Sequence, residues 1–384
     1  MKLTYIFIFG LIFSLKINAQ THNEFYQSLV DQVNYESLEG NLIEFANFGE
    51  KQLGSSAATN ALNWMVGLYQ SWGYTNIEQH EVNQWGQTGY NLIVTKTGSV
   101  YPDTYIIIDG HYDTINGPGA NDNGSGTAII LEMARILKDI NTEYSIKFVH
   151  FTAEEWGLIG SYQYVEDIVI PQNLDIRLVF NIDQVGGIAG DINDTITCEQ
   201  DQSSPNYNNS QSADFTHQLM TCMELYSDLE TNLSFAYGSD YVPFQEEGFV
   251  ITGLYEYNES PYPHSSQDTV ANVDFDFIHQ VAKGTMGALC HFAQAFNVMG
   301  TNEQNSGSVM IFPNPVDKIL AVKAQNSGEK KIQLNDLSGK IIFQDVFSNN
   351  EFHIDTSKIP NGIYILNILD GKSVSNQKII VQHK

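Results

Sequence analysis

The sequence has few cysteines, and this shortage limits how the chain can bind a metal. Only Cys198, Cys222 and Cys290 occur among 384 residues, and no Cys-x-x-Cys pair is present. A zinc site built from thiolates is therefore excluded. One disulfide is open to an exported chain, with three possible pairings. Cys222 and Cys290 lie in apolar, helix-like stretches, where buried free thiols are the commoner state.

Basic residues are also scarce, which excludes nucleic acid as a partner. Lys and Arg total 18 against 45 Asp and Glu, a formal net charge of −27. The excess lies in residues 1–308, with 9 Lys or Arg against 38 Asp or Glu, whereas residues 309–384 carry 9 Lys against 7 acids. A region with so large a negative charge repels the phosphate groups of nucleic acid. The two arginines, Arg135 and Arg177, lie in a predicted helix and a predicted strand, so an arginine clamp for a substrate carboxylate is not expected.

Long hydrophobic runs are absent after the first residues of the chain. Residues 1–19 begin with the basic Lys2, continue with an apolar stretch and end on Ala19. This order is typical of a secretory signal peptide, and the apolar stretch is shorter than the roughly 20 residues that span a bilayer. We expect cleavage after Ala19 and an exported product without a membrane span.

Two common enzyme motifs are missing as well. No Gly-x-Ser-x-Gly elbow occurs, which disfavours a serine hydrolase. The glycine-rich segment 119–126 lacks the Gly-Lys-Ser/Thr ending of a phosphate-binding loop, and Asp122 would oppose an anion there. Its acids also lack EF-hand spacing, which makes structural calcium a weak interpretation.

What the sequence does contain is an alternation of strand and helix patterns. After a helical stretch at 23–73, strands are predicted at 90–95, 105–109, 145–152, 176–182 and 250–255, and helices at 127–140, 160–168, 215–226 and 274–296. The strand at 105–109 is almost continuous in isoleucine, which is typical of a strand buried on both faces. The fold class is therefore α/β, a mixed, largely parallel sheet flanked by helices, over residues 20–297.

The pattern changes after a polar, glycine-containing linker at 298–308. Short strand-like runs follow at 319–323, 331–335, 340–343, 363–368 and 378–381, with a hairpin turn at Ser338-Gly339. The change in charge occurs at the same place. Residues 309–384 are therefore predicted to form a separate small β-sandwich.

Metal-binding side chains recur where predicted strands end. They are His111, Asp113, Asp122, Glu154, Glu155, Asp183 and His264. Taken singly, none of these residues indicates a metal site. An Asp at a strand end is more often a helix cap, a His in a loop usually faces solvent, and a Glu-Glu pair usually lies on the surface. Ligands of open α/β sheets gather at the carboxyl ends of the strands. Because so many candidates fall at strand ends or in flanking loops, we predict a metal centre, with Asp113 placed to accept the other N–H of a metal-bound His111.

These residues lie in motifs that occur in a recognisable order. The motifs are His111-Tyr112-Asp113-Thr114, 119–126, Ala153-Glu154-Glu155, Asn181-Ile182-Asp183, Ser239-Asp240 and 264–269. Over roughly residues 36–297 the chain resembles the co-catalytic zinc exopeptidases of the bacterial leucyl aminopeptidase type.

The resemblance implies two zinc ions and a role for each residue. His111 and Asp183 would hold one zinc, Glu155 and His264 the other, and Asp122 would bridge them, with a cis peptide bond to Asn123. A hydroxide bridging the two zinc ions would attack the N-terminal peptide bond of a peptide, with Glu154 as general base. Metal binding lowers the pKa of water from about 15.7 to about 7.

Some positions depart from that family's usual pattern. Asp109 replaces a small or neutral residue, and a surface or capping role is expected for it. Gln184 replaces an apolar residue. Tyr237 stands one residue away from the usual oxyanion-stabilising tyrosine and is a weaker catalytic candidate. Ser239 and Asp240 are expected to order their loop.

The C-terminal residues resemble a second family. Phe-Pro-Asn-Pro-Val at 312–316, residues 334–340 and Asn-Gly-Ile-Tyr-Ile-Leu at 361–366 are similar to the C-terminal sorting domain read by the type IX secretion system. A generic β-sandwich that binds a surface or sugar is the alternative. The resemblance implies export through the periplasm to the outside or outer surface of the cell, with the type IX machinery as partner of residues 309–384 and removal of this segment.

Other functions stay open on sequence alone. The same fold and motifs would serve a single-zinc glutaminyl cyclotransferase, or a carboxypeptidase or amidase on the same site. An adhesin with structural metals is a non-enzymatic alternative, and it predicts ligands that close every coordination position. We expect a monomer that acts on peptides with a free N-terminus.

Overall fold

A computed structural model describes residues 20–236, 238–297, 309–324, 328–336, 340–370 and 373–383. The chain divides into two compact units, residues 1–296 and 297–384. The predicted signal peptide, the linker at 298–308, the turn at 338–339 and Tyr237 lie outside the described residues. Within the described ranges, no helix combines the length and the apolar character needed to cross a bilayer.

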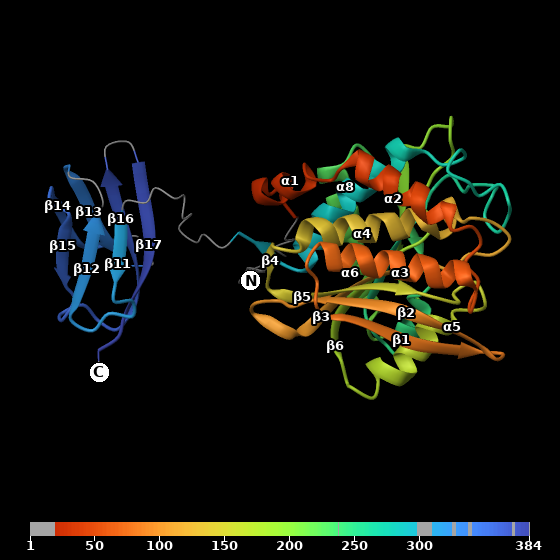
Figure 1. Ribbon diagram of the computed structural model, residues 1–384, viewed down its shortest axis with the longest axis horizontal. Helices are drawn as coiled ribbons and strands as arrows, with labels where there is room; N and C mark the ends of the chain where they lie inside the picture. Colours follow the sequence, from red (N-terminus) through yellow and green to blue (C-terminus); the bar gives the residue numbers. More distant parts are fainter. Residues whose placement is uncertain are drawn as a thin grey trace, which may run out of the picture. The chain divides into compact units, whose positions relative to one another are not determined.

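The first unit is built on one eight-stranded sheet with the order β1-β2-β5-β3-β6-β9-β7-β8 (Figure 1). The four central strands, β5, β3, β6 and β9, are mutually parallel, whereas β2 and β7 run antiparallel to their central neighbours. The strands are β1 (Ile77–Gln84), β2 (Gln87–Lys96), β3 (Tyr101–His111), β5 (Tyr144–Phe151), β6 (Asp175–Ile182), β7 (Thr195–Gln200), β8 (Glu230–Phe235) and β9 (Ile251–Glu256). The predicted mixed, largely parallel sheet is thereby confirmed.

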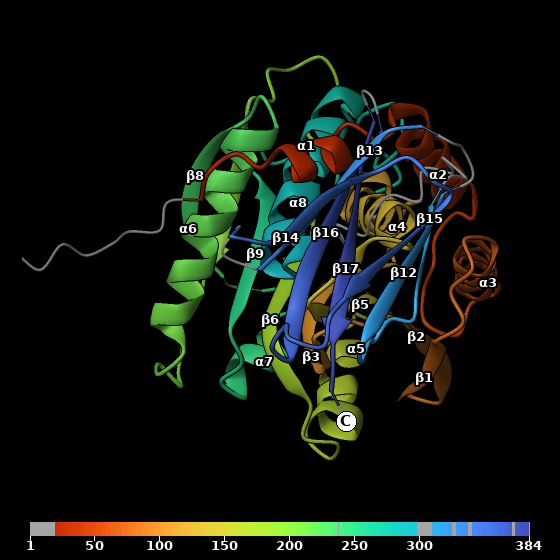
Figure 2. The same cartoon turned by 90° about the vertical axis from the view of Figure 1, so that its left-hand side faces the viewer.

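Most helices lie over one face of this sheet. They are α1 (Glu24–Val30), α2 (Tyr35–Asn47), α3 (Ser56–Ser71), α4 (Gly126–Leu137), α6 (Asn209–Tyr226) and α8 (Phe275–Phe292). Figure 2 shows α6, α8, α4 and α3 following one another across the sheet. The shorter α5 (Ile159–Tyr164), η2 (Val165–Val169) and α7 (Val242–Glu246) pack on the opposite face. A pair of short strands, β4 (Asn141–Thr142) and β10 (Ala295–Phe296), completes the unit.

The isoleucine run of β3 explains why the sheet is covered on both sides. Successive side chains of a strand point to opposite faces. Ile106 and Ile108 belong to the core beneath the larger helical layer, and Ile107 belongs to the core on the other face. All three are fully buried. The prediction that this strand is buried on both faces is confirmed.

Several elements of the first unit were not predicted. Strands β1, β7 and β8 and helix α7 carry polar or mixed sequences without a clear period. The helical stretch at 23–73 is three helices, because Asn34 and Ser55 cap new helices with their side chains. The helix predicted at 274–296 ends at Phe292, and its last two residues form β10.

The second unit contains two antiparallel sheets, with orders β11-β12-β15 and β14-β13-β16-β17. Its strands are β11 (Val309–Phe312), β12 (Ile319–Ala324), β13 (Lys330–Asn335), β14 (Ile341–Phe347), β15 (Glu351–Asp355), β16 (Gly362–Asp370) and β17 (Ser373–Val381). Alternate side chains of both sheets form one apolar core, which includes Val322, Ile332, Leu366 and Ile379. Prediction had missed β11 and β15.

Candidate metal centre

The candidate ligands stand at the carboxyl ends of the four central parallel strands. His111 is the last residue of β3, Asp183 directly follows β6, and Glu154 and Glu155 follow β5. His264 lies in the loop after β9. Because these strands are parallel neighbours, their ends meet at one edge of the sheet. The topology therefore brings together residues that are up to 153 positions apart in the sequence.

Asp122 reaches the same edge from the loop between β3 and α4. This loop, η1 (Ala120–Ser125), contains the cis peptide bond between Asp122 and Asn123, as the resemblance had implied. The Asn123 side chain anchors the loop: its Nδ2 donates to the carbonyl of Ile182 at 2.8 Å, and its Oδ1 accepts from the N–H of Gly126 at 3.0 Å. Asp122 is thus fixed beside the end of β6.

One group of ligand atoms surrounds the Nε2 atom of His111. This nitrogen lies 3.2 Å from Asp122 Oδ1 and 3.3 Å from Asp183 Oδ1. All three side chains are buried. One ligand atom from each of the three residues lies within 4.8 Å of the other two, so they could hold one metal ion.

A second group surrounds the Nε2 atom of His264. This nitrogen lies 2.8 Å from Glu155 Oε2 and 3.0 Å from Asp122 Oδ2. The His264 side chain is half exposed, so this group faces solvent more than the first does. The two oxygens of Asp122 thus belong to different groups.

The donor set fits zinc. Zinc takes nitrogen and carboxylate ligands at about 2.0–2.2 Å, and at about 2.0 Å the corners of a tetrahedron are roughly 3.3 Å apart. The separations of 2.8–3.3 Å between the ligand atoms are close to that value. One buried oxygen of the second group, Glu155 Oε1, has no hydrogen-bond partner among the described residues. A cation would satisfy it.

The charges at the site also favour a cation. Burial, followed by the Asp122 carboxylate, raises the pKa of Glu155 to about 9, and burial raises the pKa of Glu154 well above its usual range. Burial opposes charge on His111, yet the carboxylates of Glu154 and Asp183 raise its pKa well above normal. The pKa of Asp122 falls to about 2, because the nearby rings of His111 and His264 outweigh the effect of burial.

Asp113 supports the site through backbone contacts. Its carboxylate accepts hydrogen bonds from the N–H groups of Glu154 at 3.0 Å and Glu155 at 3.3 Å. The Nδ1 atom of His111 lies 3.1 Å from the Asp113 carbonyl oxygen and 3.7 Å from its carboxylate. Asp113 therefore connects β3 to the loop that carries the glutamate pair.

The backbone beside the ligands adopts conformations that non-glycine residues rarely take. Ala153, Gln184 and His264 have φ angles of 57°, 49° and 54°. Ala153 precedes the glutamate pair, and Gln184 follows Asp183. Left-handed conformations of such residues are costly and concentrate at functional sites.

Asp109 is not at the surface, as had been expected from the sequence. It is fully buried, and its Oδ1 accepts a hydrogen bond from Asn181 Nδ2 at 2.9 Å. Burial raises its pKa to about 7. The surface role was the wrong expectation, because Asp109 belongs to the same strand that the isoleucine run had already predicted to be buried on both faces. The loop role expected for Ser239 is more specific here, since its hydroxyl donates to Asp183 Oδ2 at 2.8 Å.

Sequence reasoning missed Lys51, a buried cation behind the Asp122 loop. Its Nζ donates to the carbonyls of Gly49 at 2.7 Å and Pro118 at 2.8 Å, and it lies over the ring of Phe45. Burial lowers its pKa to about 7. Nothing in the local sequence distinguishes this lysine from a surface one.

The three free cysteines are all buried, as predicted for Cys222 and Cys290.

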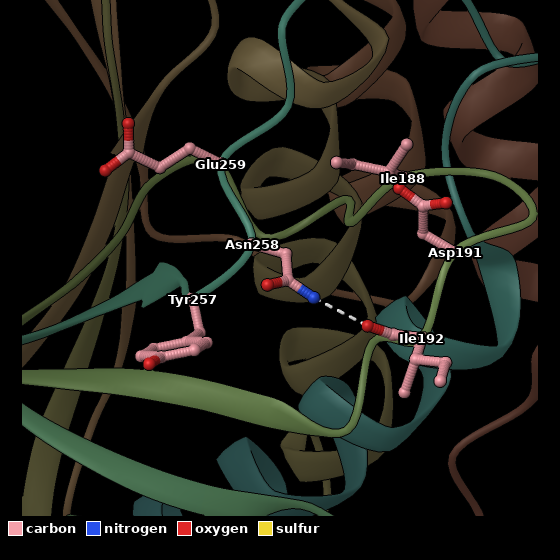
Figure 3. A pocket seen from close by; sticks show the side chains of 6 residues that line it. All are labelled: Ile188, Asp191, Ile192, Tyr257, Asn258 and Glu259. Carbon is pink, nitrogen blue, oxygen red and sulfur yellow. Dashed lines mark hydrogen bonds between the residues drawn. The ribbon is translucent and has the colours of Figure 1, made fainter.

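A pocket of about 620 Å³ opens between the loops that follow β6 and β9 (Figure 3). Ile188, Asp191 and Ile192 line it from one loop, and residues 257–259 from the other. Asn258 Nδ2 donates to the Ile192 carbonyl at 2.6 Å and joins the two walls. The first loop begins directly after Asp183, and the second leads to His264.

Comparison with known proteins follows the division into two units. A profile described as peptidase family M28 matches residues 91–288, and one described as a secretion system C-terminal sorting domain matches residues 310–382. Aminopeptidase YwaD of Bacillus subtilis strain 168 is 32% identical over 204 residues, which are 50% of this chain and 42% of YwaD. The chain thus spans less than half the length of that relative.

A second relative aligns over more of the chain. Leucine aminopeptidase 1 of Blastomyces gilchristii strain SLH14081 is 27% identical over 297 residues, covering 70% of this chain and 73% of that protein. Among solved structures, the LapA aminopeptidase of Legionella pneumophila has a TM-score of 0.63 at 19% identity, covering 77% of this chain and 81% of LapA. This last likeness is one of fold.

Proposed function

The chain belongs to peptidase family M28, and from this premise we propose that it is an exported zinc-dependent aminopeptidase. The proposal includes two zinc ions, a hydroxide shared between them as nucleophile, and Glu154 as general base. Its main support is the pair of ligand groups that share Asp122. The names of the aligned relatives, which are aminopeptidases, agree with it.

Each zinc ion has its own residues. His111 and Asp183 would hold the first, Glu155 and His264 the second, and the two oxygens of Asp122 would serve both. Together, Asp122, Glu155 and Asp183 supply three negative charges against four positive ones. When bound, the ions supply Lewis acidity, which lowers the pKa of a shared water and polarises the scissile carbonyl.

Glu154 is the residue that moves the proton. Its Oε2 lies 3.8 Å from His111 Nε2, which places it beside the first ligand group. Its raised pKa suits a group that takes a proton from the nucleophile and delivers it to the leaving amine. Asp113 holds the backbone of Glu154 in place through the hydrogen bond to its N–H.

The charge of the chain favours a substrate amine over a substrate carboxylate. Residues 1–308 are strongly acidic, and this field attracts an N-terminal ammonium group. Both arginines are already engaged: Arg135 binds Glu132 at 2.6 Å, and Arg177 lies over the rings of Tyr144 and Phe215. A carboxypeptidase would need a free cation to clamp the C-terminus.

The C-terminal unit determines where the enzyme acts. Residues 310–382 match the sorting domain of the type IX secretion system, which supports an extracellular or cell-surface location. We propose that residues 1–19 direct entry into the periplasm, that 20–297 form the catalytic domain and that 298–308 link it to the sorting domain at 309–384. The type IX machinery is the partner of that last domain.

A panel of aminoacyl-nitroanilides tests the proposed reaction. The purified protein is expected to release nitroaniline, to lose activity with a chelator and to regain it when zinc is added back. The same preparation is then given a peptide with N-terminal glutamine. Cyclisation without amide hydrolysis, together with one zinc per chain, would establish the cyclotransferase alternative. Bound zinc without any turnover would favour a structural metal role.

A further inference from the structure

Outside the ligand set, a buried carboxylate stands at the end of a central strand: Glu256 is the last residue of β9. Its side chain is only 1% exposed, and the proposed reaction assigns it no chemical step. Nevertheless its carboxylate is fully used: it accepts hydrogen bonds from three donors in three different loops. A buried carboxylate with that many partners in separate segments fixes those segments relative to one another.

Each of the three loops carries a proposed zinc ligand. Asn121 Nδ2 donates to both oxygens of Glu256, at 2.9 and 3.1 Å, and Asn121 immediately precedes Asp122. The N–H of Gly187 donates at 2.8 Å and lies four residues after Asp183. The N–H of Ser260 donates at 2.7 Å and lies four residues before His264.

Neighbouring hydrogen bonds also connect the loops that Glu256 joins. Asn121 uses its other side-chain atom, Oδ1, to accept from the N–H of Gly186 at 2.7 Å. The carboxylate of Asp268 accepts from the N–H groups of Asn121 at 2.7 Å and Asp122 at 3.0 Å. Two of the three loops that Glu256 joins, those after β6 and β9, are also the walls of the pocket in Figure 3.

We propose that Glu256 is a positioning residue that sets the spacing of Asp122, Asp183 and His264 by holding their three loops together. This inference rests on the proposed function, because it concerns the ligands of the proposed zinc site. Glu256 touches neither substrate nor zinc. It acts through the backbone of the loops, and its loss changes the distances between ligands whose identities are unchanged.

Glu256→Gln is the direct test, with Glu199→Gln as the matched control. Gln keeps the size of the side chain but replaces one acceptor oxygen with an NH2 group, which would face an N–H donor. Glu199 on β7 is also a buried glutamate, but its carboxylate accepts from the Tyr241 hydroxyl at 2.8 Å. Both variants remove a buried carboxylate from adjacent strands.

Zinc affinity is measured by competition with a chelator, and kcat and KM are measured at saturating zinc. Glu256→Gln is expected to weaken zinc binding by about 10–100-fold and to lower kcat more than it raises KM, as loss of ligand support does elsewhere. Glu199→Gln is expected to leave both properties near wild type. Equal zinc affinity and equal kcat in the two variants would overturn the role of Glu256.

Two further measurements keep the outcome interpretable. If Glu256→Gln does not fold, Glu256→Asp, which keeps the charge but shortens the reach, is expected to show the same zinc defect, and wild-type affinity in it would overturn the proposal. If the wild-type protein binds zinc but hydrolyses no aminoacyl-nitroanilide, the proposed function fails. The competition experiment then still decides whether Glu256 positions the ligands.

Discussion

The two units of the chain bury very different kinds of side chain. The first unit buries several carboxylates, among them Asp109, Asp122, Asp240 and Glu256, as well as the ammonium group of Lys51. In the described part of the second unit, the only polar or charged residues that are buried are Lys330 and Thr356, and the core is aliphatic and aromatic.

The comparison shows that the buried ionisable groups, which are energetically unfavourable, are concentrated in the first unit. Burying a charge without a partner is costly, so buried ionisable groups concentrate where a cation, a reaction or a positioning hydrogen bond uses them. In the first unit, burial is the largest cause of the raised pKa values of Asp109, Glu154 and Glu155. The second unit carries no comparable cluster in its described residues, and its buried side chains are mainly apolar.

The largest effect is expected from Glu154→Gln. The substitution removes the general base but none of the proposed ligands, so kcat should fall by about 10²–10⁴-fold while zinc content stays near two per chain. Activity assays and elemental analysis check this. Glu166→Gln, an exposed change on η2, should leave both unchanged. Loss of zinc in Glu154→Gln would show that Glu154 is a ligand instead.

His264→Ala should reduce zinc content and activity together. Loss of a ligand weakens metal binding by more than the roughly 10–100-fold that removal of a supporting hydrogen bond costs. The matched control is His217→Ala, since His217 is exposed on α6 and bonds to the Ala213 carbonyl of its own helix. Unchanged zinc in His264→Ala would remove this residue from the ligand set.

Leu366→Ala tests whether the second unit depends on its apolar core alone. Leu366 is fully buried in β16, and its truncation should cost that unit about 2–5 kcal/mol of unfolding free energy. Denaturant unfolding measures this, and kcat/KM at low denaturant should stay at the wild-type value. Leu178→Ala in β6 is the counterpart in the first unit. This variant should lose activity at a lower denaturant concentration than the wild type does. A fall in kcat/KM of folded Leu366→Ala would contradict the separation of roles.

His150 gives the smallest predicted effect, on acid stability. It is fully buried, its Nε2 lies 2.9 Å from the Tyr69 hydroxyl, and burial lowers its pKa to about 3. Because the unfolded chain binds this proton near pH 6.5, stability is lost as pH falls from about 6.5 toward 3. At pH 5 the loss is about 2 kcal/mol at 1.36 kcal/mol per pKa unit.

The measurement is the unfolding free energy at pH 8 and pH 5. His150→Gln should reduce the difference between the two pH values, whereas His353→Gln, at an exposed position of β15, should not. An identical pH dependence in His150→Gln and wild type would show that His150 is not kept neutral by burial.

The sequence was informative about elements with a strong pattern. The isoleucine run of β3 and the amphipathic α4 and α8 were predicted, because burial on one or both faces leaves a period in the sequence. Strand β8 was missed, since its residues are largely partly buried or exposed and its composition is mixed. The resemblance, rather than periodicity, supplied the roles of the ligands.

The support of the site could not be predicted in the same way. Each of three supporting residues makes a hydrogen bond to a backbone group at least 65 positions away: Glu256 to the Gly187 N–H, Asn121 to the Gly186 N–H and Lys51 to the Pro118 carbonyl. Such bonds leave no spacing signal, because any backbone N–H or carbonyl looks alike in sequence. Only the arrangement of the strand ends brings these groups together.

Zinc anomalous scattering from crystals of the full chain tests the central claim most directly. Two peaks are predicted, one bounded by His111, Asp122 and Asp183 and the other by Asp122, Glu155 and His264. A single peak, or a peak away from Asp122, would contradict the account of a shared carboxylate between two ions.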